Sequence, residues 1–252
     1  AAIWLKDQGY KIGFNLMQIN NANEGKIAKL LKLANTYPID VLYFADSMGS
    51  LNTQQITTIV NTFKDNWSGA IGIHAHDSMG NAINNSMQAV NDGASWVDCT
   101  VTGMGRGPGN AQTEYLSIEL DSYRNLDTNK TKLFKLIRNH FNPLKEQYGW
   151  GINPYYYLAG KHNIHPTYIQ KMITDTRYDE EDIISVINYL KEQGGKGFNP
   201  DVLETARHFY SGNAQGTWKP EGAIKNNNVL IIGPGPSSTS HCEAVESYIK
   251  TH

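Results

Sequence analysis

Two hydrophobic patterns take turns along the first half of the chain. Four short apolar runs of the kind found in buried strands begin 26 to 30 residues apart, over residues 11–17, 41–46, 70–76 and 96–102. Between the runs, apolar residues recur at helical spacing, as at Ile27, Leu30, Leu31 and Ala34. A helix that links two strands in this way returns the chain to the same end of the sheet. The pattern therefore predicts four strand–helix units with parallel strands and the helices outside them.

The residues at the helix ends agree with this prediction. Asn23 and Thr53 stand where N-caps are expected, and Gly93 stands where a helix would close on a left-handed residue. Asn110 precedes a predicted helix over residues 113–120 and is a further candidate N-cap.

Polar residues collect where each predicted strand ends, at Asn15, Asp46, His74, His76 and Thr102. Doubly wound sheets usually carry a glycine-rich loop after their first strand, whereas residues 15–18 contain no glycine. A (β/α)₈ barrel builds its active site at the carboxyl ends of its strands. We therefore expect an α/β fold in which residues 1–125 form the C-terminal half of a TIM barrel.

The remainder of the chain has a different character. Residues 126–211 predict a helical post-barrel domain, with an apolar stripe at Leu133, Leu136, Ile137 and Phe141 and helices over residues 166–173, 179–193 and 199–210. Residues 212–228 are polar and glycine-containing, as in a linker. Residues 229–252 read as a strand, a glycine turn and a helix, the truncated start of a nucleotide-binding-like α/β domain. The first residue is not Met and residues 1–9 resemble the end of a helix, so we expect a fragment of a longer protein.

Composition narrows the class of protein. With 252 residues, 40% of them hydrophobic, and a net charge of −2, the chain shows no bias towards nucleic acid or an anionic membrane. No apolar run approaches the length of a membrane span. Cys99 and Cys242 lie far apart and suggest no disulfide framework, so we expect a cytoplasmic protein.

The pair His74 and His76 is the first candidate for chemistry. Alternation along a strand puts both side chains on one face, with Cα atoms roughly 6.6 Å apart, so that both rings can reach one metal ion. The alternative is that the two rings only form hydrogen bonds with neighbouring backbone groups. Residues 103–109, one unit further on, form a loop with alternating glycines, which let backbone approach a ligand closely.

The order of three motifs carries a resemblance. Residues 45–49 (ADSMG), 74–77 (HAHD) and 103–110 (GMGRGPGN) together resemble the DRE-TIM metallolyases, an HMGL-like family of lyases and synthases. The opening strand, GFNLM over residues 13–17, is more similar to its 4-hydroxy-2-oxovalerate aldolase branch. The family's Asp-Arg-Glu motif of the first strand is absent. Arg106, Gly107 and Pro108 also stand where hydroxymethylglutaryl-CoA lyase carries a cysteine.

The resemblance implies a site and a cofactor. It implies that His74, His76 and Asn110 are ligands of a divalent metal, Mn²⁺ ahead of Mg²⁺ or Zn²⁺. Asp46 resembles the family's pocket carboxylate and is a candidate to orient water or relay a proton; the alternative is a carboxylate satisfied by turn amides. A tyrosine after the barrel, Tyr155 or Tyr156, is the second catalytic candidate, although aromatic residues there more often pack between domains.

The implied function is a metal-dependent aldolase that breaks or forms a carbon–carbon bond next to a 2-oxo acid. The alternatives are a Claisen-type synthase that joins an acyl-CoA to a 2-oxo acid, and a non-catalytic barrel scaffold. We expect a small 2-oxo acid as ligand, no nucleic acid or membrane partner, and a homodimer or a partner enzyme bound through the helical domain. Because the first-strand Arg and the fourth ligand are missing, we expect this chain alone to be inactive. A half barrel also leaves the strand edges at residues 11–17 and 96–102 unpaired, so we expect the chain to be prone to self-association.

Overall fold

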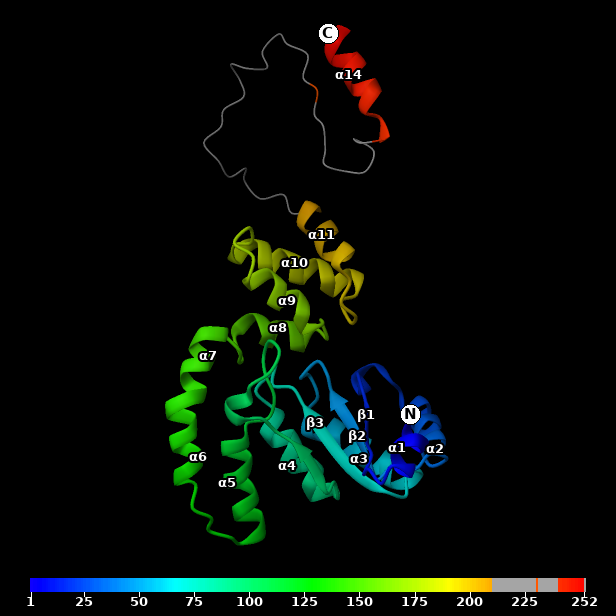
Figure 1. The fold of residues 1–252 in the computed structure, drawn as a ribbon, viewed down its shortest axis with the longest axis vertical. Helices are drawn as coiled ribbons and strands as arrows, with labels where there is room; N and C mark the ends of the chain where they lie inside the picture. Colours follow the sequence, from blue (N-terminus) through cyan, green and yellow to red (C-terminus); the bar gives the residue numbers. More distant parts are fainter. Residues whose placement is uncertain (210–229, 231–239, 252) are drawn as a thin grey trace. The chain divides into compact units, whose positions relative to one another are not determined.

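A computed structural model describes residues 1–209, 230 and 240–251 (Figure 1). The chain divides into two compact units, Ala1–Ser211 and Gly212–His252. In the second unit the described helix is α14 (Cys242–Thr251). The predicted linker and nearly all of the predicted strand over residues 229–232 lie outside the described residues, so the proposed domain boundaries remain a prediction.

The first unit contains the predicted parallel sheet. Its strands are β1 (Gly13–Leu16), β2 (Val41–Asp46), β3 (Ala70–Ala75) and β4 (Trp96–Asp98), in the order β1-β2-β3-β4. All three pairings are parallel. The α/β class with a parallel sheet is therefore confirmed.

Strand β2 has the predicted bounds, whereas β1 and β3 end one residue earlier than the hydrophobic runs predict and β4, which was expected to continue to Thr102, ends at Asp98. Residues Val101–Gly103 instead form the 3₁₀ turn η2. Thr102 has a left-handed φ of 54°, and its N–H donates to the Glu114 carboxylate at 3.0 Å, away from any strand neighbour. The apolar run therefore extends beyond the strand, and its later residues direct their backbone hydrogen bonds to groups outside the sheet.

Alternation gives the two faces of the sheet different chemistry. One face buries aliphatic and aromatic side chains, including Leu42, Phe44, Ile71, Ile73 and Ala75. The strand registers pair Asn15 with Tyr43 and His74 with Asp98, so these four residues share the opposite face. The fold thus presents its polar strand residues together on one side.

Four helices accompany the apolar face: α2 (Glu24–Ala34), α3 (Thr53–Asn66), α4 (Ala82–Asp92) and α5 (Thr113–Arg124) (Figure 1). Ile27, Ile56 and Ala89 lie in the same core cluster as the strand residues. Packing of an apolar helix stripe on the sheet is the main source of stability for such units.

Two predicted helix caps are confirmed and two are wrong. Asn23 accepts a hydrogen bond from Lys26 N, and Gly93 closes α4 with a φ of 117°. Thr53 is already helical, because Asn52 before it forms a capping box with Gln55. Gln112, rather than Asn110, precedes α5.

The helical segment also belongs to the first unit. It comprises α6 (Thr131–Leu136), the π-helix η3 (Ile137–Phe141), α7 (Asn142–Tyr148), α8 (Pro154–Lys161), α9 (Pro166–Ile173), α10 (Glu180–Gln193) and α11 (Pro200–Phe209). Helices α8 to α11 enclose a second core around Tyr168, Ile187 and Leu190. The stripe predicted from Leu133 to Phe141 is helical, but α6, η3 and α7 contain no buried residue.

Helix α8, which the sequence did not predict, approaches the loops that follow β2 and β3. A Cβ on Gly160 would lie 2.9 Å from the Met79 side chain and 3.1 Å from that of Ser78, so only glycine permits this approach. Ser50 Oγ also donates to Asn163 Oδ1 at 2.8 Å. The helical segment therefore closes over the carboxyl ends of the strands. Two further short elements, α1 (Ala2–Asp7) and η1 (Ile19–Asn21), complete the unit.

None of the described helices is both long and apolar enough to cross a membrane. A cytoplasmic location remains a prediction.

Candidate metal centre

His74 and His76 stand side by side at the carboxyl end of β3. Their ring centroids are 5.1 Å apart and the ring planes are nearly perpendicular, at 85°. His74 is the next-to-last residue of the strand, and its Nδ1 lies 3.3 Å from Asp98 Oδ2 on β4. A carboxylate on Nδ1 selects the tautomer that leaves Nε2 with a free lone pair.

His76 is held by backbone instead of a carboxylate. Its Nδ1 lies 3.2 Å from the Gly109 carbonyl oxygen, and it forms an isolated antiparallel bridge with Asn110. Burial, with smaller contributions from the charges of His74 and Arg106, lowers the pKa of His76 to about 4. The neutral ring then donates from Nδ1 to Gly109 and keeps the Nε2 lone pair, as a metal ligand must.

Asn110 supplies the third polar group. The residue is 8% exposed, and its Nδ2 donates to the Met104 carbonyl oxygen at 3.2 Å. Its Oδ1 is buried and accepts no hydrogen bond. A buried carbonyl oxygen without a donor is costly, and a bound cation would satisfy it. Together with the free Nε2 atoms, this oxygen fits a divalent metal that takes nitrogen and oxygen ligands.

The glycine loop is shaped to hold Asn110 in place. A Cβ on Gly105 would lie 2.3 Å from Asn110 Nδ2, so the side chain needs glycine there. Gly103, Gly107 and Gly109 have φ values of 68°, 59° and 80°, which L side chains rarely adopt. Trp150 Nε1 donates to the Thr102 carbonyl oxygen at 3.0 Å and ties the loop to the segment before α8.

Asp46 lies apart from this group. The strand register pairs it with Ala75, on the apolar face, and not with His74. Its buried carboxylate accepts hydrogen bonds from Asn20 Nδ2 at 2.7 Å, Ser50 N at 3.1 Å and Leu51 N at 3.0 Å. Burial raises the pKa of Asp46, and these hydrogen bonds oppose the shift. These contacts agree with the alternative in which amides of the following turn satisfy the carboxylate. A catalytic role for Asp46 remains a prediction.

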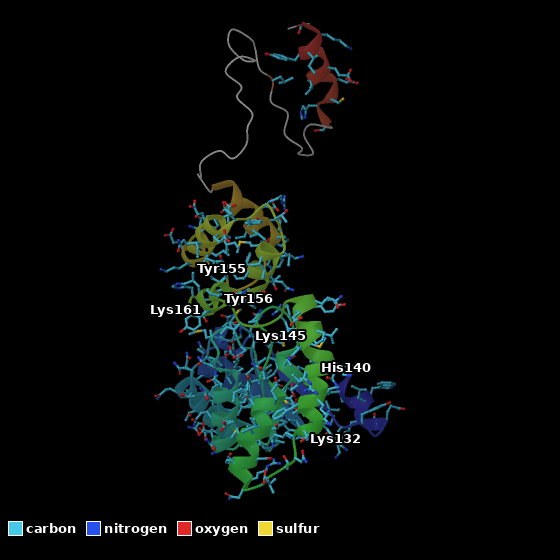
Figure 2. All side chains as sticks on the ribbon, turned by 90° about the vertical axis from the view of Figure 1, so that its left-hand side faces the viewer. Lys132, His140, Lys145, Tyr155, Tyr156 and Lys161 are labelled. Carbon is cyan, nitrogen blue, oxygen red and sulfur yellow. The ribbon has the colours of Figure 1, made fainter. Side chains whose placement is uncertain are left out.

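The two tyrosine candidates both lie on α8 (Figure 2) and both take part in the second core, but they differ in burial. Tyr155 is half-buried and packs against the second core. Tyr156 is 1% exposed, and its ring lies 3.2 Å from the place that a Cβ on Gly107 would take. Burial raises the pKa of Tyr156 to about 12. Tyr156, rather than Tyr155, therefore contacts the glycine loop, and a catalytic role for either residue remains a prediction.

Asp77 caps the helix that follows the histidines. Its Oδ1 accepts a hydrogen bond from Ala82 N at 2.9 Å, at the start of α4. Its own N–H donates to the Gly109 carbonyl oxygen at 3.1 Å. These contacts are those of a helix cap.

Asp98, whose carboxylate faces His74, was not predicted from the sequence as part of the site. The available sequence signal was a carboxylate within the apolar run over residues 96–102, but only the register of β3 and β4 places it beside His74. Within the part of the chain that the structure describes, no group of three or more His, Cys, Asp or Glu side chains could hold a metal. The candidate centre consists of two imidazoles and one amide oxygen.

Parts of the chain are similar to proteins of known families. The HMGL-like family model matches residues 2–139. The 4-hydroxy-2-oxovalerate aldolase of Pelotomaculum thermopropionicum is 36% identical over 111 residues, which are 44% of this chain and 33% of that protein. The enzyme of the same name from Thermus thermophilus is 37% identical over 118 residues, 46% of this chain and 34% of that protein. The chain thus spans about a third of the length of the curated relatives it matches.

Solved structures show the same fold. The N-terminal domain of a protein assigned as an aldolase from Bacteroides vulgatus superposes with a TM-score of 0.64 and 31% identity, over 73% of this chain and 60% of that one. Pyruvate carboxylase of Rhizobium etli superposes with a TM-score of 0.61 over 82% of this chain and 23% of that one. Its identity is 13%, so this likeness concerns the fold alone.

Proposed function

The chain belongs to the HMGL-like family, and from this premise we propose that it carries the metal centre of a lyase that breaks a carbon–carbon bond next to a 2-oxo acid. Relatives in this family are aldolases, which supports lyase chemistry at the level of the family. The specific reaction we propose resembles that of 4-hydroxy-2-oxovalerate aldolase, with pyruvate as one product.

The observation that carries this proposal is the unpartnered Oδ1 of Asn110 beside two histidines whose Nδ1 atoms are both engaged. We propose that His74, His76 and Asn110 bind a divalent ion, with Mn²⁺ preferred over Mg²⁺ or Zn²⁺. Such an ion would act as a Lewis acid towards the oxygen atoms of the 2-oxo acid.

The protein's own groups have separate tasks in this proposal. Asp98 and the Gly109 carbonyl orient the two imidazoles, and the glycine loop admits the substrate close to backbone. Cleavage requires a base that takes the proton of the 4-hydroxyl group while the bond between C3 and C4 breaks and an aldehyde leaves. Asp46 and Tyr155 are the proposed candidates for proton transfer. Tyr156, which contacts the glycine loop, is the alternative to Tyr155.

We further propose that the four strand–helix units are the second half of a (β/α)₈ barrel, and that turnover requires the remaining half. Two observations support this proposal. The polar strand residues share one face of the sheet, and the chain matches about a third of the length of its relatives. The helical segment over residues 126–211 is the proposed post-barrel domain, and a homodimer or a partner enzyme would bind through it.

The first test is ligand binding by the chain itself. Mn²⁺ should bind the wild-type chain, and pyruvate should bind it more tightly with Mn²⁺ than without, as measured by isothermal titration calorimetry. His74→Ala should lose both effects, whereas His140→Ala, at an exposed histidine of η3, should keep them. Equal Mn²⁺ binding by wild type and His74→Ala would contradict the proposed centre.

The second test concerns the reaction. In the longer protein that contains both barrel halves, pyruvate release from 4-hydroxy-2-oxo acids would support the aldolase. Release of free CoA from an acyl-CoA and a 2-oxo acid would instead identify the Claisen-type synthase. A protein that binds the ligands and does neither would be the non-catalytic scaffold.

A further inference from the structure

Arg106 lies within the glycine loop and reaches the helical segment. Its guanidinium donates from one terminal nitrogen to Thr167 Oγ1 at 3.1 Å. Thr167 is in the first turn of α9, directly after Pro166 and two residues after the N-cap His165. This hydrogen bond holds an otherwise exposed side chain in one place, between the loop and the helix.

The same loop couples Arg106 to the metal centre. Gly109 N donates to the Arg106 carbonyl oxygen at 3.1 Å, and the Gly109 carbonyl accepts from His76 Nδ1. Arg106 therefore lies in the loop that leads directly to Asn110, and its hydrogen bond to Thr167 turns the guanidinium towards α9.

Arg106 also has donors to spare. Among the residues that the structure describes, no Asp or Glu forms an ion pair with it. A guanidinium carries five N–H donors in a planar fork, and one hydrogen bond to Thr167 leaves most of them free. That fork matches the geometry of a carboxylate or a phosphate, because it donates two parallel hydrogen bonds to two oxygen atoms of either group.

We propose that Arg106 binds a second carboxylate of the substrate, so that the site selects 2-oxo acids that carry another carboxylate over simple ones. This inference rests on the proposed function, in which the first carboxylate and the keto oxygen are taken up at the histidine centre. Because Thr167 anchors Arg106 towards α9, the guanidinium is positioned for the far end of the substrate. Thr167 is then a positioning residue that acts through Arg106.

The test compares two probes at a fixed Mn²⁺ concentration: pyruvate, with one carboxylate, and 2-oxoglutarate, with two. Calorimetry on the full chain should show 2-oxoglutarate binding at least about tenfold more tightly, as hydrogen bonds to charged groups require. Arg106→Gln should lose that preference while its affinity for pyruvate stays within about twofold of wild type. Thr167→Val, which removes only the anchoring hydroxyl, should lose part of the preference.

A matched control is Arg138→Gln. Arg138 is an exposed arginine of η3 whose side chain hydrogen-bonds to the adjacent Asn139, and its replacement should leave the preference unchanged. The inference is overturned if pyruvate binds but Arg106→Gln keeps the wild-type ratio, and the proposed function then stands. If neither acid binds the wild-type chain, the proposed function and this inference fall together.

Discussion

Asp98 offers the sharpest test of how the strands build the metal centre. Asp98→Ala removes the carboxylate that faces His74 Nδ1 at 3.3 Å. Without it, the His74 ring gains rotational freedom and access to the other tautomer, so fewer molecules present Nε2 to a metal. We predict weaker Mn²⁺ binding with an otherwise intact fold.

The expected size follows from the geometry. Loss of the group that orients a metal-bound histidine typically lowers metal affinity about 10-fold to 100-fold. The contact is long for a charge-assisted hydrogen bond, and the side chains of His74 and Asp98 are 26% and 46% exposed, so water screens it. We therefore expect the lower end of the range, about tenfold, or ~1.4 kcal/mol. Asp98→Asn should lose less, because its amide oxygen can still accept from Nδ1.

Calorimetric titration of Mn²⁺ measures the effect, and thermal unfolding confirms that the variants fold. Asp65→Ala, at an exposed aspartate of α3, is the matched control and should bind like wild type. If Asp98→Ala binds Mn²⁺ as tightly as wild type while His74→Ala does not, the carboxylate does not orient the ligand, and this reasoning is refuted.

Three further predictions concern the loop, the pH dependence and the sheet edges. Gly105→Ala should lower Mn²⁺ affinity about tenfold or more, because the new Cβ would displace the Asn110 amide. The control Gly197→Ala, which has open space around it, should keep the wild-type affinity. Equal Mn²⁺ affinities of the two variants would contradict the role of the loop. Hydrogen bonds from Lys130 and Thr128 lower the pKa of Asp121 to about 2, so its stabilising contribution should be complete above pH ~4 and fade as the pH falls towards 2. The difference in melting temperature between wild type and Asp121→Asn should shrink over that range, and a constant difference would argue against it. The outer strands β1 and β4 expose Phe14 and Trp96, at 49% and 53%, so light scattering should show self-association of the chain. Trp96→Lys should reduce this self-association. A monodisperse wild-type monomer would contradict the prediction.

Local sequence determined the four strands, the helices between them and their order. Apolar runs bounded by polar loops located all four strands, and helical periodicity located the helices between them, because burial of one face leaves a repeat that can be read without coordinates. Pro166 and Pro200 are the first residues of α9 and α11, in agreement with the preference of proline for the first turn of a helix. The histidine pair was visible because residues two apart at the end of an extended run share a face.

Tertiary structure decided everything that depends on residues distant in the chain. Asp98 meets His74 only because β4 pairs with β3 in one register, and a shift of one residue would have turned it to the other face. The orphan oxygen of Asn110 exists because Gly105 allows the amide to reach Met104, and the Thr167 anchor of Arg106 exists because α9 packs beside the loop. Asp46 shows the converse. Its polar side chain at a strand end suggested a place in the pocket, but the register aligns it with Ala75, and amides of the following turn donate to its carboxylate. Sequence specifies which groups are present, but the pairing of strands and the packing of helices decide which of them meet.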